Sequence, residues 1–155
     1  KVRRDLRKAA VIYDSKFGNT EKIARALSEG MKREGLLVDC FKTDAVDPGK
    51  LGEYDMLAVG APTQMFRISR PMRELLGKLE DVDLRGKKGF AFDTRFKSRF
   101  AGSAANGIEK KLKELGVTII RGYASAIVGG AEGPLEENSE RNFEQIGSEI
   151  AKTVA

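Results

Sequence analysis

The most informative segment of the chain is Asp14-Ser15-Lys16-Phe17-Gly18-Asn19-Thr20, at residues 14–20. It follows a β-branched, apolar run at 9–13 and precedes a segment in which Ile23, Leu27 and Met31 recur at helical spacing. This pattern predicts a strand, a tight turn and a helix, with free backbone N–H groups at the positive end of the helix dipole. Such a turn binds anions, and its hydroxyl and amide side chains add neutral donors. Because the Lys-Ser/Thr ending of a di- or triphosphate loop is missing, we expect a monophosphate.

The composition is typical of one globular domain, which we place at residues 1–155 with a charged N-terminal extension at 1–8. Hydrophobic residues make up 41% of the chain and charged residues 33%, so a disordered chain is not expected. No apolar run approaches the roughly 20 residues of a membrane span, and no signal-peptide pattern is present. The single Cys40 and the absence of His argue against a disulfide framework and a transition-metal site. We therefore expect a cytoplasmic protein without a metal.

Strands and helices alternate along the chain. Strands are expected at 9–14, 36–41, 54–60, 90–93 and 117–128, the last interrupted near Arg121-Gly122. Helices are expected at 20–34, 71–79 and about 104–115, and a closing helix is marked by Phe143, Ile146, Ile150 and Val154. Apolar strands between amphipathic helices indicate a parallel sheet covered on both faces, an α/β three-layer, doubly wound sandwich.

The first turn also decides between the two common strand orders. It has no G-x-G-x-x-G, so the dinucleotide-binding order is disfavoured and we predict a five-stranded parallel sheet of order 2-1-3-4-5. Ligands of such sheets bind beyond the carboxyl ends of the strands, near the point where the strand order reverses. We therefore expect the loops at 14–20, 60–69 and 93–103 to converge on one site.

These three loops resemble those of the flavodoxin family. The resemblance lies in residues 11–24, in Gly60-Ala-Pro-Thr63, and in Asp93-Thr-Arg-Phe96 followed by Gly102-Ser-Ala and the helix at 108–116. It covers about residues 9–153, and the first loop is its most specific part. The resemblance implies a flavodoxin-like fold, a noncovalently bound flavin mononucleotide (FMN) and one-electron transfer, without catalytic side chains of the protein's own.

The resemblance also implies which residues surround the flavin. The first loop is expected to hold the phosphate, and Pro62 and Thr63 to meet the ribityl chain and the pyrimidine edge. Met65 or Phe66, Phe96 and Phe100 are the candidates for the apolar walls of the ring, since the chain has no Trp. The predicted cofactor-binding residues are Ser15, Lys16, Phe17, Gly18, Asn19, Thr20, Ala61, Pro62, Thr63, Gln64, Met65, Phe66, Asp93, Thr94, Arg95, Phe96, Phe100, Gly102 and Ser103.

The chain departs from the family in its charge, because flavodoxins are usually acidic around the flavin. Here 28 basic residues outnumber 23 acidic ones, and the second and third loops are followed or interrupted by cations. These cations are Arg67, Arg70, Arg73, Arg95, Lys97 and Arg99. Since the fully reduced flavin is an anion in this fold, we expect its formation to occur at a less negative potential than in acidic flavodoxins.

The same charge predicts the kind of partner. A basic face that includes Arg67, Arg70, Arg95, Lys97 and Arg99 is expected to dock an acidic redox protein of the ferredoxin or reductase type. Nucleic acid is not an expected partner, because the cluster comes without a recognition motif. No membrane contact is expected either.

Two other functions stay open from the sequence. An FMN-dependent NAD(P)H:quinone oxidoreductase uses a related fold, and its members resemble this chain in the first strand and its loop. The chain is alternatively the excised flavodoxin domain of a larger flavoprotein, such as a flavodiiron protein, which its Lys1 start and charged residues 2–8 would fit. A signalling receiver is excluded, because the third strand ends in Gly60-Ala61-Pro62 and not in an acidic phosphoacceptor.

Overall fold

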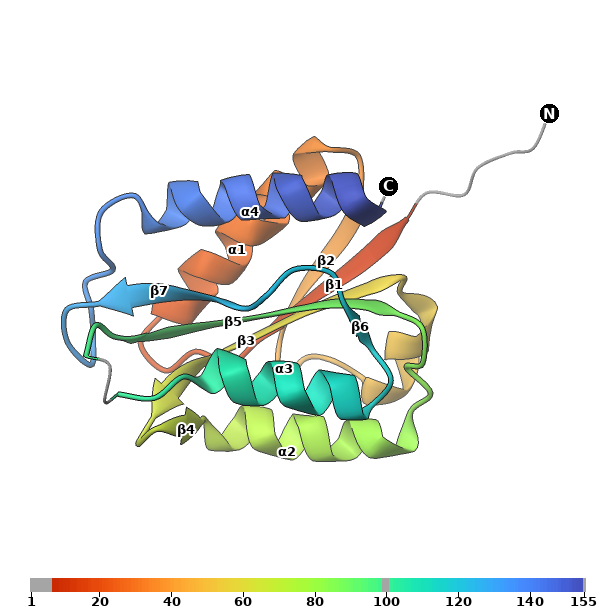
Figure 1. The fold of residues 1–155 in the computed structure, drawn as a ribbon, viewed down its shortest axis with the longest axis horizontal. Helices are drawn as coiled ribbons and strands as arrows, with labels where there is room; N and C mark the ends of the chain where they lie inside the picture. Colours follow the sequence, from red (N-terminus) through yellow and green to blue (C-terminus); the bar gives the residue numbers. More distant parts are fainter. Residues whose placement is uncertain (1–6, 99–100, 155) are drawn as a thin grey trace.

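The central sheet follows the predicted strand order (Figure 1). The computed structural model describes residues 7–98 and 101–154. Its parallel strands are β1 (Lys8–Tyr13), β2 (Leu37–Lys42), β3 (Met56–Gln64), β5 (Lys88–Phe96), β6 (Thr118–Ile119) and β7 (Ala124–Val128). They lie in the order β2-β1-β3-β5-β6, with β7 also paired to β5. Because β6 and β7 are the two halves of the interrupted fifth strand, the order 2-1-3-4-5 is confirmed.

Helices cover both faces of the sheet, which gives the predicted three layers (Figure 1). The helices α1 (Asn19–Arg33) and α4 (Ser139–Val154) lie on one face, and α2 (Arg70–Lys78) and α3 (Ala104–Glu114) lie on the other. Short 3₁₀ helices, η1 (Pro48–Glu53) and η2 (Leu79–Asp81), precede β3 and follow α2. Each face buries its own apolar cluster. Within the described residues, no helix has both the length and the apolar character to span a bilayer.

Two glycines let α1 and α4 pack with their backbones almost in contact. A Cβ on Gly30 of α1 would overlap the carbonyl oxygen of Glu144 in α4. A Cβ on Gly147 of α4 would likewise overlap the carbonyl oxygen of Leu27 in α1. This close approach fixes α1, and with it the turn at its N-terminal end, against the sheet.

Two strands run further toward the site than the sequence predicted. Residues 61–64 and 94–96 were expected in loops but belong to β3 and β5. Their pairing explains the extension, since Pro62 lies opposite Thr94 in β5 and Phe96 lies opposite Val128 in β7. The chain then reverses at Met65 and Phe66 into β4 (Arg67–Ile68), which is antiparallel to β3. Part of the candidate site therefore stands on rigid strands.

The second strand differs from the prediction in its burial. Apolar strands covered on both faces were expected throughout the sheet, but β2 forms its edge and, among the described strands, pairs with β1 alone. Its residues alternate between exposed and half-buried, and Leu37 is 47% exposed. Cys40 is half-buried, and this burial raises the pKa of its thiol. A thiol with a raised pKa is poorly nucleophilic, which favours a structural role of Cys40 over a reactive one.

Candidate functional site

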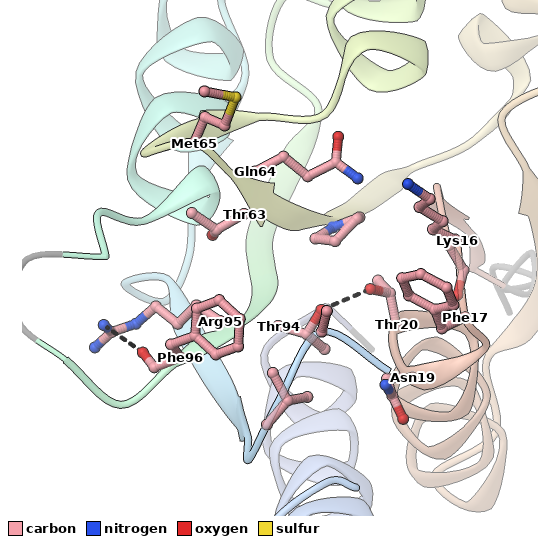
Figure 2. A pocket seen from close by; sticks show the side chains of 14 residues that line it. Lys16, Phe17, Asn19, Thr20, Thr63, Gln64, Met65, Thr94, Arg95 and Phe96 are labelled. Atoms are coloured by element: carbon pink, nitrogen blue, oxygen red, sulfur yellow. Dashed lines mark hydrogen bonds between the residues drawn. The ribbon is translucent and has the colours of Figure 1, made fainter. Parts of the chain in front are cut away.

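A cavity of about 400 Å³ lies at the carboxyl ends of β1, β3 and β5, where the three predicted loops meet (Figure 2). Its size is within the range of about 300–1,000 Å³ that is usual for small-molecule sites. Twelve of the predicted cofactor-binding residues line it. They are Ser15, Lys16, Phe17, Asn19, Thr20, Pro62, Thr63, Gln64, Met65, Thr94, Arg95 and Phe96.

Other predicted residues stand outside the cavity wall. Gly18, Ala61, Phe66 and Asp93 neighbour the lining residues in sequence but are not part of the lining, and Gly102 and Ser103 at the start of α3 are not part of it either. Phe100, together with Arg99 of the predicted basic face, lies outside the described residues. Gly18 shapes the first loop through its backbone, because it is the N-cap of α1 and has φ 93°. This left-handed conformation is accessible to glycine without strain.

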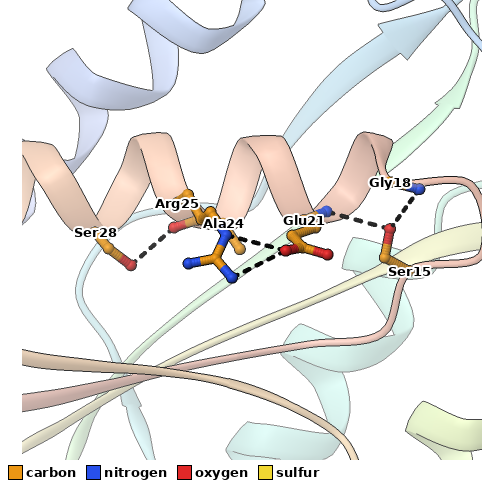
Figure 3. A network of polar contacts seen from close by, with 6 residues as sticks. All are labelled: Ser15, Gly18, Glu21, Ala24, Arg25 and Ser28. Atoms are coloured by element: carbon orange, nitrogen blue, oxygen red, sulfur yellow. Dashed lines mark hydrogen bonds and ion pairs between the residues drawn. The ribbon is translucent and has the colours of Figure 1, made fainter.

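The first loop is held in shape by one hydroxyl. Ser15 Oγ accepts hydrogen bonds from Gly18 N (3.1 Å) and Glu21 N (3.3 Å), as Figure 3 shows. Both acceptor positions of this hydroxyl are therefore used by amides at the start of α1. No described residue is seen to accept the Ser15 proton, so the hydroxyl is able to donate to an anion in the cavity. Further along α1, Glu21 pairs with Arg25 at 2.9 Å on the exposed side.

A pair of hydroxyls connects the first and third predicted loops. Thr20 Oγ1 of α1 and Thr94 Oγ1 of β5 are 2.8 Å apart, and both residues are almost fully buried (Figure 2). Since each hydroxyl has one proton, one of them donates to the other and the accepting hydroxyl keeps its own proton. Both residues line the cavity, so the pair offers one donor there.

A fourth segment completes the wall, and the sequence interpretation missed it. Val128 at the end of β7 and Ala131 after it also line the cavity. A Cβ on Gly133 would lie 3.1 Å from the side-chain amide of Asn19, so this segment is close to the first loop. The signal was available, because the fifth strand ends at the same sheet edge and is followed at once by Gly129-Gly130.

The cavity has apolar walls that remain open to solvent. Phe17 is 47% exposed, Phe96 is 45% exposed and Met65 is 87% exposed. Figure 2 shows Phe17 and Phe96 on opposite sides of the Thr20–Thr94 pair. Exposed aromatic side chains around a cavity are suited to a flat apolar ligand, because such a ligand covers them on binding.

The hydroxyl of Thr63 is engaged within the protein. Thr63 Oγ1 donates to Asp93 Oδ2 (3.1 Å) and accepts from Ala104 N (2.8 Å) at the start of α3. The sequence assigned this hydroxyl to the ribityl chain and the pyrimidine edge of a flavin, but its proton is already used. The hydroxyl of Thr63 therefore offers a ligand no donor, and one acceptor position of its oxygen remains.

Positive charge lies in the wall and at the rim. Arg95 is half-buried in the wall, where its Nε donates to Ser125 Oγ (3.1 Å) and its Nη1 to Phe96 O (3.3 Å). Lys16 Nζ lies 5.4 Å from the centroid of the Phe17 ring, at cation–π distance. Three further residues of the predicted basic face, Arg67, Arg70 and Lys97, are exposed, and Arg70 pairs with Glu74.

Comparisons with known proteins identify the family and agree with the fold. The family model for flavodoxin matches residues 11–146. The flavodoxin of Clostridium saccharobutylicum is 30% identical over 157 aligned residues, which cover 95% of this chain and 97% of that protein. A solved flavodoxin structure from the domain Archaea superposes with a TM-score of 0.81 at 26% identity, covering 95% of this chain and 98% of the other.

The likeness extends to a class of enzymes. An NAD(P)H dehydrogenase (quinone) of Cupriavidus metallidurans is 31% identical over 139 residues, which cover 73% of this chain and 69% of that protein. The flavodoxins match along nearly their whole length and the family model spans most of the chain. The chain therefore belongs to the flavodoxin family of flavin-binding electron-transfer proteins.

Proposed function

We propose that this flavodoxin binds FMN in the 400 Å³ cavity and carries single electrons between partner proteins. The observation that supports FMN best is the first loop, where a free hydroxyl proton, the start of α1 and the Thr20–Thr94 donor surround one end of the cavity. The flavin supplies the redox chemistry when bound. The chain's own residues bind the phosphate through Ser15 and the one donor of the Thr20–Thr94 pair, and cover the ring with Phe17, Met65 and Phe96.

The test is a titration with FMN and riboflavin, which differ only in the phosphate. Wild-type protein is expected to quench the fluorescence of both ligands and to bind FMN more tightly. Ser15→Ala should lower the affinity for FMN by about tenfold or more, because a hydrogen bond to a charged group contributes about 1.5–3 kcal/mol. The affinity for riboflavin should change much less.

A matched control is available in α1, the helix that follows the first loop. Ser28 Oγ donates to Ala24 O inside α1 and is not part of the cavity wall (Figure 3). Ser28→Ala should therefore leave the ratio of the two affinities unchanged. If wild-type protein showed neither heat nor fluorescence change with FMN, the proposed cofactor would be refuted.

We further propose that the redox partner presents an acidic face. Arg67 and Lys97 are exposed beside the apolar rim formed by Met65, Phe66 and Phe96, so a partner covering the rim meets these cations. Attraction between opposite charges speeds encounter and weakens with salt. Electron transfer to an acidic ferredoxin should slow as ionic strength rises, and the charge-removing pair Arg67→Gln and Lys97→Gln should flatten that dependence. A rate indifferent to salt would contradict an acidic partner.

A second candidate function is reduction of quinones by NAD(P)H. The likeness to the Cupriavidus metallidurans enzyme supports it. Steady oxidation of NADH or NADPH by the FMN-loaded protein with a quinone acceptor would favour the enzyme. An electron carrier should show no turnover above free FMN under the same conditions.

A further inference from the structure

A buried carboxyl group stands behind the cavity wall and gathers three donors. Asp93 in β5 is fully buried and is not part of the lining. Its Oδ2 accepts from Ser103 Oγ (2.7 Å) and Ala105 N (3.0 Å), and also from the Thr63 hydroxyl (3.1 Å). These donors belong to the N-terminal end of α3 and to the end of β3. The Oδ2 atom of Asp93 therefore links β5 to the end of β3 and to the start of α3.

The other carboxyl oxygen shows that this arrangement is costly. Asp93 Oδ1 is buried, and no partner for it is found among the described residues. An unsatisfied buried acceptor lowers stability, and the three hydrogen bonds that Oδ2 accepts offset this cost. The start of α3 offsets part of this cost, because a helix N-terminus favours a negative group.

The segment that Asp93 holds is strained. Between β3 and β4 the chain turns at Met65 (φ 48°) and Phe66 (φ 71°), both in the left-handed region. Two-residue hairpin turns of this kind strongly prefer Asn and Gly, and bulky residues adopt them only when the surroundings enforce them. The hairpin formed by residues 63–68 is therefore strained, and contacts with other elements are needed to hold its turn in this conformation.

Two anchors are present, one at each end of the hairpin. At its base, Thr63 is hydrogen-bonded to Asp93 and to Ala104 N. At its tip, Phe66 forms a β-bridge with Gly102, where a Cβ would lie only 2.8 Å from Phe66 Cα. Gly102 directly precedes Ser103, the N-cap of α3, so both anchors depend on how the start of α3 is placed. Asp93 fixes that start through Ser103 and Ala105.

We propose that Asp93 is a positioning residue, which holds the hairpin and the start of α3 together and so sets the cavity wall at Thr63–Met65. It acts without touching the ligand. The identity of the ligand rests on the proposed function, but the positioning role does not.

The test compares Asp93→Asn with Asp83→Asn by hydrogen exchange in the protein without flavin. Asn keeps the volume of Asp93 and one acceptor oxygen but loses the charge that strengthens the three hydrogen bonds. Exchange should rise about tenfold or more in residues 61–68 and 101–106, and stay unchanged in 15–27. Asp83 is an exposed carboxylate that pairs with Arg85, away from the cavity, and its variant should match wild type.

Ligand titrations supply a second readout. Asp93 acts on the wall at Thr63–Met65, away from the loop proposed to hold the phosphate. Asp93→Asn should therefore lower the affinities for FMN and for riboflavin by the same factor, about tenfold, and leave their ratio unchanged. Unchanged exchange at 61–68, or exchange raised evenly over all elements, would overturn the positioning role. Local exchange without loss of affinity would overturn its effect on the wall. If wild-type protein bound no FMN, the proposed cofactor would fail, while the exchange measurement would still decide the role of Asp93.

Discussion

Replacing Arg95 with Gln should lower the potential at which a bound flavin becomes fully reduced. Arg95 stands in the cavity wall, where Ser125 and the carbonyl of Phe96 hold its guanidinium. The fully reduced flavin of this family is an anion, so a nearby cation favours its formation. Gln removes the charge and keeps a side-chain donor for Ser125.

The magnitude follows from the size of the cavity. A cavity of 400 Å³ has a radius of about 5 Å, so a charge in its wall lies about 5–10 Å from a ligand inside. Coulomb's law with an effective dielectric constant of about 40–80 gives about 0.4–1.7 kcal/mol over that range. Since about 1.4 kcal/mol corresponds to about 59 mV for one electron, the second reduction should shift by about 20–70 mV to more negative potential.

The assay is an equilibrium redox titration of the FMN-loaded variants against reference dyes. Arg70→Gln is the matched control, because Arg70 is exposed, pairs with Glu74 and is not part of the wall. We expect a shift of less than about 10 mV for this control, since its charge is screened by solvent. A potential that rises in Arg95→Gln, or that shifts no more than in Arg70→Gln, would refute the electrostatic argument.

Two further predictions concern stability. Gly30→Ala should lower the free energy of unfolding by about 1–3 kcal/mol, because its methyl group would overlap the carbonyl of Glu144. Gly77→Ala in α2 has open space around the new methyl group and should raise that free energy by up to about 1 kcal/mol; urea titrations that rank the two variants equally would contradict the packing argument. Burial, and then the hydrogen bond to Asp39, raise the pKa of Tyr54 to about 12, so the folded state favours the neutral phenol. The contribution of Tyr54 to stability should therefore be fully present below about pH 10 and be lost as the pH rises toward about 12. The drop in the urea midpoint between about pH 9 and about pH 11 should be smaller in Tyr54→Phe than in wild type, and an equal drop would contradict this linkage.

The fold was largely predictable, because each element carries its own local signal. The apolar run before Asp14 and the helical spacing after Thr20 define β1 and α1 to within one residue. The missing G-x-G-x-x-G was enough to choose the strand order that the sheet has. The errors lie where pairing overrides local pattern: Pro62 and Thr94 read as loop residues but extend two strands because they lie opposite each other.

The site was less predictable than the fold, because the sequence shows which polar groups are present but not which of them are already used. Thr63 and Thr94 are both threonines at strand ends, and the sequence gives no reason to treat them differently. In the structure the Thr63 hydroxyl donates to Asp93, 30 positions away. Thr94 instead shares one hydrogen bond with Thr20, 74 positions away, and one hydroxyl of that pair can still donate. Hydrogen bonds over such separations are set by the packing of the sheet. A motif can therefore locate a candidate ligand site, while the roles of its hydroxyls follow only from their partners.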